Sequence, residues 1–190
     1  MSITTAQREK SLATTSPVDI PLYELPVIEL IPDQLRTVDA LAEDRNESYK
    51  EIDGGVVFGK NDALTSHQIG ILGEIAVAHR YNVEIDTETY RFGDDGTDLV
   101  LGNKTVDVKA TATDAMRYPQ LLVRTDKELT ADLYFRVHVL DWGADRARVR
   151  LLGYASKERV TDRKPRRHPG TKENYVVEPE ELTLPPCVRI

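Results

Sequence analysis

The stretch GTDLVLGNKTVDVKA, Gly96–Ala110, decides how the rest of the chain is interpreted. Its two apolar runs lie on either side of Gly102-Asn103, a dipeptide typical of a two-residue turn, so the stretch predicts a β-hairpin. Three charged side chains interrupt the apolar pattern: Asp98, Asp107 and Lys109. A hairpin that packs on a core has no structural need for two carboxylates and an ammonium, so these charges require an explanation of their own.

Strand geometry places these charges relative to one another. Successive side chains of a strand point to opposite faces, so Asp107 and Lys109 share one face and lie roughly 7 Å apart. Val106 and Val108 point to the other face, which we expect to be the core face. Asp98 lies on the preceding strand and shares the charged face if the hairpin register allows it.

A long helix is predicted upstream of the hairpin, over residues 61–82, NDALTSHQIGILGEIAVAHRYN. The segment has no proline, and Asn61, Asp62 or Thr65 could cap its start. It is apolar nearly all round, which is typical of a buried helix. Apart from Asp62 at its start, Glu74 is the only acidic group in this segment, so a helix packed on the hairpin would bring this carboxylate to the charged face.

Glu74, Asp98, Asp107 and Lys109 would then form one cluster. Three neighbouring carboxylates repel one another and raise one another's pKa, and a folded protein tolerates them when a divalent cation lies between them. Mg²⁺ prefers carboxylate oxygen, carbonyl oxygen and water, and Mn²⁺ binds similar ligands. The sequence therefore predicts a divalent-metal site at the hairpin.

These motifs occur in the same order as the motifs of a known family. The segments concerned are GILGEIAVAHRY with Glu74, GDDGTDLVL with Asp98, and TVDVKAT with Asp107 and Lys109, all within about residues 62–155. Together they resemble the PD-(D/E)xK nuclease superfamily. This resemblance implies the restriction-endonuclease-like fold, in which a mixed central β-sheet is flanked by helices.

The resemblance also implies roles for individual residues. Asp98, Asp107 and the backbone carbonyl of Val108 would be metal ligands, and Glu74 would bind a metal directly or through water. Lys109 would orient or deprotonate the attacking water and stabilise charge near the phosphate. The implied activity is Mg²⁺- or Mn²⁺-dependent hydrolysis of phosphodiester bonds, and a DNA endonuclease is the expectation.

The D-x-K triplet alone carries little weight, because the chain contains two of them. Asp162-Arg163-Lys164 lies in a basic, proline-flanked segment with no predicted strand, so we interpret it as chance. The triplet at Asp107 differs because a helix glutamate and a strand aspartate precede it. Two alternatives stay open: an ordinary exposed ion pair between Asp107 and Lys109, and a non-catalytic nucleic-acid-binding or structural assembly protein that reuses the fold.

One departure from the family pattern concerns the segment after the D-x-K strand. The superfamily usually continues there into a helix, whereas ATATDAMRYPQ, residues 110–120, is short and has Pro119 near its end.

Helices followed by mostly antiparallel strands predict the α+β class. A helix is expected at 31–46, and strands are expected at 83–92, 97–101, 104–111, 120–124, 132–140 and 146–155. The chain divides into an N-terminal extension at 1–30, a nuclease-like domain at 31–155, and a basic loop with a C-terminal segment at 156–190 that packs on the same domain. None of the histidines has metal-ligand spacing, and His138 is expected at a surface position of its strand.

Charge distribution bears on the partner. The chain has a net charge of −7, yet the segment 157–172 holds seven Lys/Arg and two Asp/Glu. Its residues Arg163, Lys164, Arg166 and Arg167 are expected to bind phosphates in a salt-dependent manner. DNA is the expected partner, RNA stays open, and a homodimer would suit an enzyme that cuts both strands with one site per chain.

Cysteine usage and hydropathy give the expected compartment. Cys187 is the only cysteine, so an internal disulfide framework is excluded and a reducing, cytoplasmic location is expected. No apolar run approaches the roughly 18 residues of a membrane span, and residues 1–19 lack the apolar segment of a secretory signal. No membrane association is expected.

Overall fold

Helices and strands both contribute to the fold, which belongs to the α+β class, as the sequence predicts. The computed structural model describes residues 21, 24–50, 63–85, 96–112, 118–168 and 172–185. Its elements are β1 (Val27–Leu30), α2 (Pro32–Lys50), α3 (Ala63–Tyr81), β2 (Leu99–Leu101), β3 (Lys104–Thr111), β4 (Leu121–Arg124), β5 (Leu133–Trp142), β6 (Ala147–Ser156), α4 (Lys157–Thr161), β7 (Arg166–Arg167), β8 (Glu173–Val177) and the 3₁₀ helix η3 (Pro179–Glu181).

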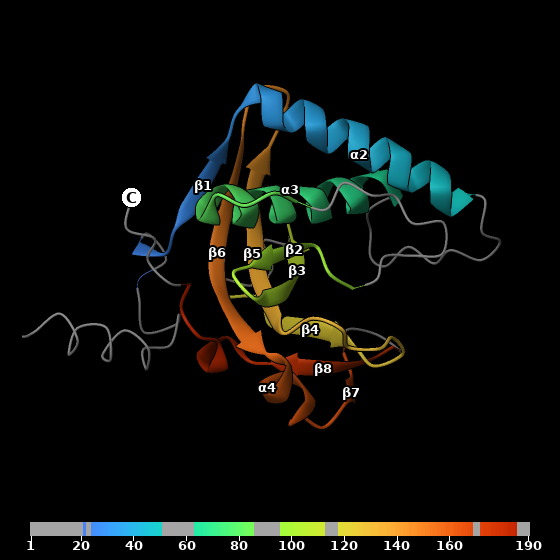
Figure 1. Ribbon diagram of the computed structural model, residues 1–190, viewed down its shortest axis with the longest axis vertical. Helices are drawn as coiled ribbons and strands as arrows, with labels where there is room; N and C mark the ends of the chain where they lie inside the picture. The colour runs from blue at the N-terminus through green and yellow to red at the C-terminus, as the bar shows by residue number, and fades with distance from the viewer. Residues whose placement is uncertain are drawn as a thin grey trace, which may run out of the picture.

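The main sheet has five strands in the order β1-β6-β5-β3-β2. Every neighbouring pair is antiparallel except β3 and β5, which run parallel, so the sheet is mixed. Figure 1 shows α3 crossing in front of β5 and β6, with α2 beyond it. Helix α3 therefore covers one face of the main sheet, and α2 packs on α3.

The predicted hairpin is confirmed as β2 and β3. Leu101 pairs with Lys104, so the loop holds only Gly102 and Asn103. Gly102 has φ +64°, the left-handed sign that a two-residue hairpin turn requires at its first central position. The turn fixes the register and thereby sets which side chains of β3 face the core.

A second sheet, in the order β4-β8-β7, is antiparallel throughout. After β3 the chain continues to β4 in this second sheet and then returns to the main sheet as β5. Residues 113–117, where the family pattern would place a helix, lie outside the described residues. This route brings β4 close to both β3 and β5, so the second sheet lies beside the strand that carries Asp107 and Lys109.

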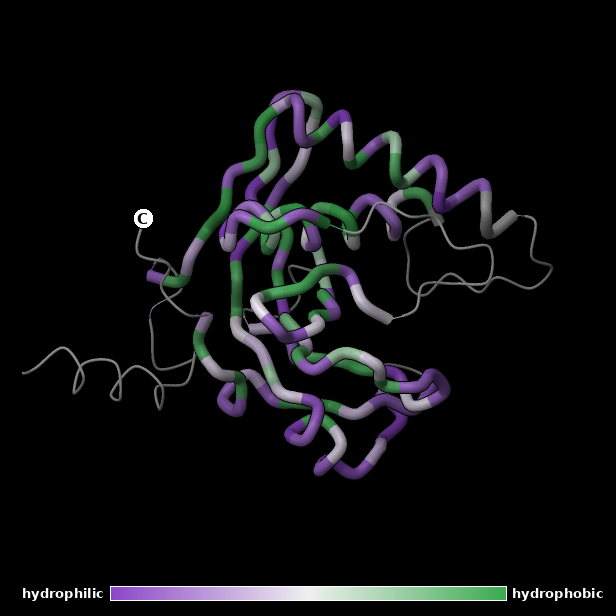
Figure 2. The backbone as a smooth tube through the Cα atoms, viewed as in Figure 1, coloured by the Kyte–Doolittle hydropathy of each residue, from purple (hydrophilic) through white to green (hydrophobic). Residues whose placement is uncertain are grey.

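The larger core lies between the helices and one face of the main sheet. The valines of β3 and alternate residues of β5 contribute to it, as the sequence predicts: Val106, Val108, Phe135, Val137 and Val139. Helix α3 supplies a run of buried residues from Ile69 to Ala78. Figure 2 shows α3 coloured mostly as hydrophobic. The prediction of a buried apolar helix is therefore confirmed.

A smaller core lies on the opposite face of the main sheet. Tyr134 of β5 packs there with Leu121 and Val123 of β4, whereas the next residue, Phe135, belongs to the larger core. In the β3–β5 register Asp107 is the partner of Tyr134. The charged face of β3 therefore points toward the second sheet and away from α3.

The structure corrects two sequence-based expectations and adds detail to a third. β1 is an edge strand with buried Ile28 and Leu30, so the main sheet begins inside the segment 1–30. The segment 156–190, expected as a basic loop with a C-terminal segment that packs on the same domain, contributes β8, the central strand of the second sheet. His138 is buried and not at the surface, because β5 is a central strand with both faces covered.

Two further expectations are resolved in part. Of the strand expected at 83–92, only 83–85 are described, and Ile85 forms an isolated bridge with Leu99. The expected helix at 31–46 extends to Lys50. Within the described ranges, no helix is both long enough and apolar enough to cross a membrane.

Gly73 allows the close approach of α3 to the main sheet. A Cβ at this position would lie 2.8 Å from Val137 Cγ2 and 2.9 Å from Ala110 Cβ. We predict that Gly73→Ala lowers the free energy of unfolding by about 1–2 kcal/mol in urea denaturation, because overpacking outweighs the gain in helix propensity.

The matched control is Gly70→Ala on the same helix. Within the described part of the chain, the one atom near its added Cβ is Glu74 Oε1 at 3.9 Å. This variant should be more stable than the wild type by about 0.5–1 kcal/mol. Equal effects of the two substitutions would contradict the close approach at Gly73.

Candidate functional site

Asp107 and Lys109 lie side by side on β3. Lys109 Nζ is 2.6 Å from Asp107 Oδ2, which confirms the predicted shared face. The Asp107 side chain is 11% exposed, whereas that of Lys109 is 35% exposed. The carboxylate is therefore held at the wall of the protein, and the lysine ammonium can reach solvent.

Asp98 directly precedes the first residue of β2 and continues its pairing with β3. Its N–H donates to the Val106 carbonyl at 2.8 Å, and its Oδ2 accepts a hydrogen bond from the Val108 N–H at 2.6 Å. Burial raises the pKa of Asp98 well above its ordinary value, and the negative charges of Glu74 and Asp107 raise it further. The Val108 hydrogen bond and Lys109 act in the opposite direction. Asp98 is thus a buried carboxyl in a negatively charged environment.

Glu74 is buried on α3, directly after Gly73. Both of its oxygens accept hydrogen bonds from Arg45 of α2, at 2.8 and 2.9 Å. This bidentate contact neutralises Glu74 within the protein and connects α2 to α3. Arg45 was missed in the sequence, because nothing in the polar side of α2 distinguishes it from its neighbours.

The carboxylates of the site are the kind of ligand that a hard divalent cation prefers, but they do not lie close enough together to bind one ion in this arrangement. Each carboxylate already has a hydrogen-bonded partner: Arg45 for Glu74, the Val108 N–H for Asp98, and Lys109 for Asp107. Among the described residues, no three His, Cys, Asp or Glu side chains are close enough to hold a metal ion. The Val108 side chain lies in the larger core. Metal binding through Asp107 Oδ2 would require the Lys109 contact to open.

A cavity of about 330 Å³ separates the charged face of β3 from the second sheet. Asp107 and Lys109 line it, whereas Glu74 and Asp98 do not. The rest of the wall comes mainly from β4, β8 and the loop after β4: Gly96, Leu122, Val123, Arg124, Lys127, Glu128, Leu129, Thr130, Tyr134, Lys172 and Asn174. Four cationic and two anionic side chains line the cavity, a local excess of positive charge in a chain of net charge −7.

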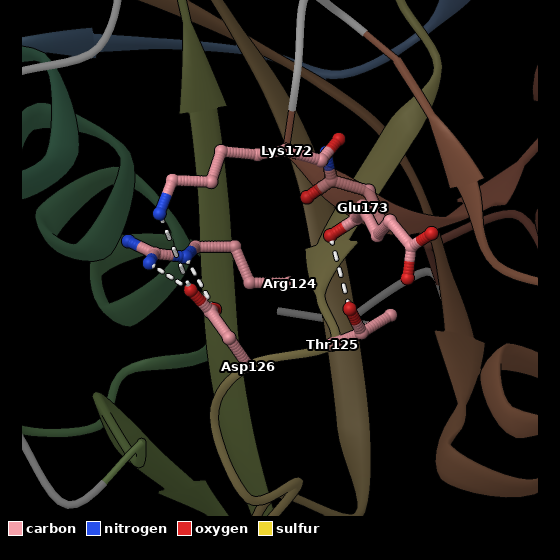
Figure 3. A network of polar contacts seen from close by, with 6 residues as sticks. Arg124, Thr125, Asp126, Lys172 and Glu173 are labelled. Atoms are coloured by element: carbon pink, nitrogen blue, oxygen red, sulfur yellow. Dashed lines mark hydrogen bonds and ion pairs between the residues drawn. The ribbon is translucent and has the colours of Figure 1, made fainter.

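An ion-pair network holds two of these cations in place, as Figure 3 shows. Arg124 contacts Asp126 through Nε, at 2.7 Å, and through Nη2. Lys172 Nζ lies 3.8 Å from the same carboxylate. The hydrogen bonds from Arg124 lower the pKa of Asp126. Asp126 therefore keeps its charge and orients both cations at the cavity wall.

The basic residues predicted to bind phosphate do not line this cavity. Arg163 pairs with Glu181 at 2.7 Å, and Arg166 pairs with Glu178. Lys164 and Arg167 are exposed on the turn after α4 and on β7. Lys172, at the end of the same basic segment of sequence, is the residue that reaches the cavity.

Arg136 is a buried cation next to the site. It is the β5 partner of Lys109, and its Nη1 donates to the Lys109 carbonyl at 2.9 Å. Among the described residues no carboxylate pairs with it, and its Nε has no hydrogen-bond partner. Burial lowers its pKa to about 10. A buried guanidinium without a counter-charge destabilises the fold, so its position beside Lys109 points to a role at the site.

No protein-family model, curated protein or solved structure matches this chain. The functional assignment consequently depends on the chemistry of the residues above.

We predict strong coupling between Arg45 and Glu74. Arg45→Met and Glu74→Gln should each lower the free energy of unfolding by about 2–4 kcal/mol, because each leaves a buried or half-buried charge without its partner. The double variant should lose clearly less than the sum of the two single losses, as measured by urea denaturation.

The control for this cycle is the exposed Arg148–Asp141 pair, in which Arg148 Nε lies 2.8 Å from Asp141 Oδ2. Arg148→Met should cost no more than about 1 kcal/mol, because solvent screens an exposed pair. Additive losses at Arg45 and Glu74 would show that their contact does not stabilise the protein.

We predict that Arg136→Met raises the free energy of unfolding by about 1–2 kcal/mol, because removal of the uncompensated charge outweighs the lost hydrogen bond to Lys109. For a chain of this length, the midpoint of thermal unfolding should rise by about 2–4 °C per kcal/mol. A lower midpoint would mean that the guanidinium is compensated in the folded protein.

Proposed function

We propose that the protein is a metal-dependent nuclease with a restriction-endonuclease-like fold. The observation that carries this proposal is the placement of Asp107 and Lys109 at the wall of a cation-lined cavity, beside the buried Asp98. A nuclease needs acidic oxygens for a metal, a mobile cation near the reacting phosphate, and a positive surface for the substrate strand. The hairpin and the second sheet together offer all three.

Asp98 and Asp107, with the backbone carbonyl of Val108, are the residues that would hold Mg²⁺ or Mn²⁺. When bound, such an ion polarises the phosphoryl oxygens and lowers the pKa of an attached water. The Asp98 carboxylate is fixed by the Val108 N–H and therefore has one defined orientation. The pKa of Asp98 is raised in the absence of a metal, and a bound cation would lower it again, because a neighbouring positive charge favours the ionised carboxylate.

Lys109 is the group that moves in this proposal. Its ammonium contacts Asp107, yet its partly exposed side chain can swing from the carboxylate into the cavity. There it would orient the attacking water or stabilise negative charge on the phosphate. Arg136 holds the Lys109 carbonyl and fixes the backbone from which this side chain extends.

Glu74 has an indirect role in this proposal, because Arg45 occupies both of its carboxylate oxygens. It contributes negative charge next to Asp98 and acts on a metal only through water. Arg163, Lys164, Arg166 and Arg167 would contribute at most to binding of distant parts of a nucleic acid.

A second function is favoured by one specific observation. The closed Asp107–Lys109 ion pair and the absence of a ready ligand set among the described residues suit a protein that binds nucleic acid without cleaving it. DNA is the expected partner for either function, and RNA and a homodimer both remain compatible with the site.

The test is cleavage of supercoiled plasmid and of single-stranded DNA with Mg²⁺ or Mn²⁺. We expect Asp107→Asn and Lys109→Met each to lower the cleavage rate at least about 100-fold, because each removes a group that acts directly on the reaction. Asp162→Asn, in the second D-x-K triplet, and Lys157→Met, on an exposed lysine of α4, are matched controls, since neither residue lines the cavity. These controls should keep the wild-type rate.

Two results would contradict the nuclease. One is a wild-type protein that cuts neither substrate with either metal but binds DNA. The other is cleavage that persists unchanged in both Asp107→Asn and Lys109→Met, which would place the activity elsewhere or in a contaminant.

A further inference from the structure

The cavity beside Asp107 and Lys109 has two chemically different parts. Leu122, Leu129 and Tyr134 give it an apolar wall. Tyr134 belongs to the smaller core, and Leu129 packs against that core. Lys127, Arg124 and Lys172 place cations around that wall. A site of this kind suits a ligand with one apolar face and at least one negative charge.

A stretch of continuous duplex does not match this wall. Duplex DNA presents phosphates and sugars on its outside and keeps the flat faces of its bases stacked inside. It would satisfy the cations but leave the apolar wall without a partner. An unpaired base, in contrast, exposes its apolar face, and such faces pack readily on apolar and aromatic side chains.

The cavity size agrees with one nucleotide. Small-ligand pockets generally have volumes of about 300–1,000 Å³, so a cavity of about 330 Å³ takes a single base with its sugar and not a base pair. Asn174 lines the cavity and is buried, and its Nδ2 is held by the carbonyl oxygens of His168 and Lys172 at 2.6 and 3.4 Å. Its amide is therefore a fixed polar group at the wall.

The cations are arranged for phosphates on both sides of such a base. Lys109 stands at the β3 end, next to Asp107. Arg124 and Lys172 are oriented by Asp126 at the wall formed by the second sheet. Lys127 is exposed and makes no ion pair within the described part of the chain, so its charge is available to a ligand.

We propose that this cavity binds one unpaired nucleotide, so that the substrate is single-stranded or locally unpaired nucleic acid. The proposal rests on the proposed nuclease function only for the cleavage step, because binding of the nucleotide needs no metal. An enzyme that takes a base out of a duplex must disrupt stacking and pairing, so a strand that is already unpaired is the favoured substrate.

The experiment measures binding to the full chain in EDTA by fluorescence anisotropy. The probes are labelled oligonucleotides of about twelve nucleotides, a length within the range that single-strand-binding folds cover. They are oligo-dT, oligo-U and a DNA duplex of the same length. We expect one of the single strands to bind at least about tenfold more tightly than the duplex, and the comparison of dT with U identifies the preferred sugar.

Two variants test the location. Leu122→Trp fills the cavity and should weaken single-strand binding about tenfold, which is the contribution expected of one stacked base. Lys127→Glu should weaken it at least about threefold, because it reverses a charge at the cavity. The control is Lys157→Glu, the same charge change on an exposed lysine outside the cavity, which should stay within about twofold of the wild type. Lys127 is exposed, so its variant decides the question even if Leu122→Trp does not fold.

The outcomes separate this proposal from the nuclease assignment. Duplex binding as tight as single-strand binding, or equal losses in Lys127→Glu and Lys157→Glu, would overturn the single-nucleotide cavity even if the protein cleaves plasmid. Single-strand binding that depends on Leu122 and Lys127, with no cleavage under any metal condition, would support the cavity and refute the nuclease.

Discussion

The parallel pairing of β3 with β5 is the constraint on which the site depends. The register sets Val108 beside Phe135 in the larger core, and one residue earlier it sets Asp107 beside Tyr134 on the opposite face. A shift by one residue would bury the charges under α3 and expose the valines. Because the connection between these strands passes through β4, the same pairing also brings the second sheet to the charged face and creates the cavity.

The charged side chains around the hairpin are of two kinds: those with an oppositely charged partner and those without one. Arg45 compensates Glu74, and Lys109 compensates Asp107, so these pairs lower the cost of burying acidic groups. Asp98 and Arg136 have no such charged partner at hydrogen-bonding distance among the described residues. Burial raises the pKa of Asp98 and lowers the pKa of Arg136, and both shifts favour the neutral form of the side chain. Groups that burial destabilises in this way are concentrated at functional sites, because packing alone would favour apolar residues there.

Local patterns predicted much of this arrangement, because the relevant signals lie within one or two elements. Alternation in β3 and β5, the Gly102-Asn103 turn and the apolar character of α3 were sufficient for the hairpin, the buried helix and the shared face of Asp107 and Lys109. Long-range pairing left no local signal. The pairings of β1 with β6 and of β8 with β4 join short strands that lie far apart in sequence, and the Arg45–Glu74 contact joins residues 29 apart on separate helices.

The two D-x-K triplets show why a motif needs a structural argument. Asp162 and Lys164 are exposed on a turn, where water screens their charges and many other side chains would serve equally well. Asp107 is buried against an aromatic partner strand, and a carboxylate there must lose most of its hydration. Only the burial of Asp107 therefore costs free energy of folding, and a functional role would explain why a carboxylate stands at this position. The physical basis for assigning a site to Asp107 and Lys109 is therefore this burial, together with the cavity that they line, and not the spacing of the triplet.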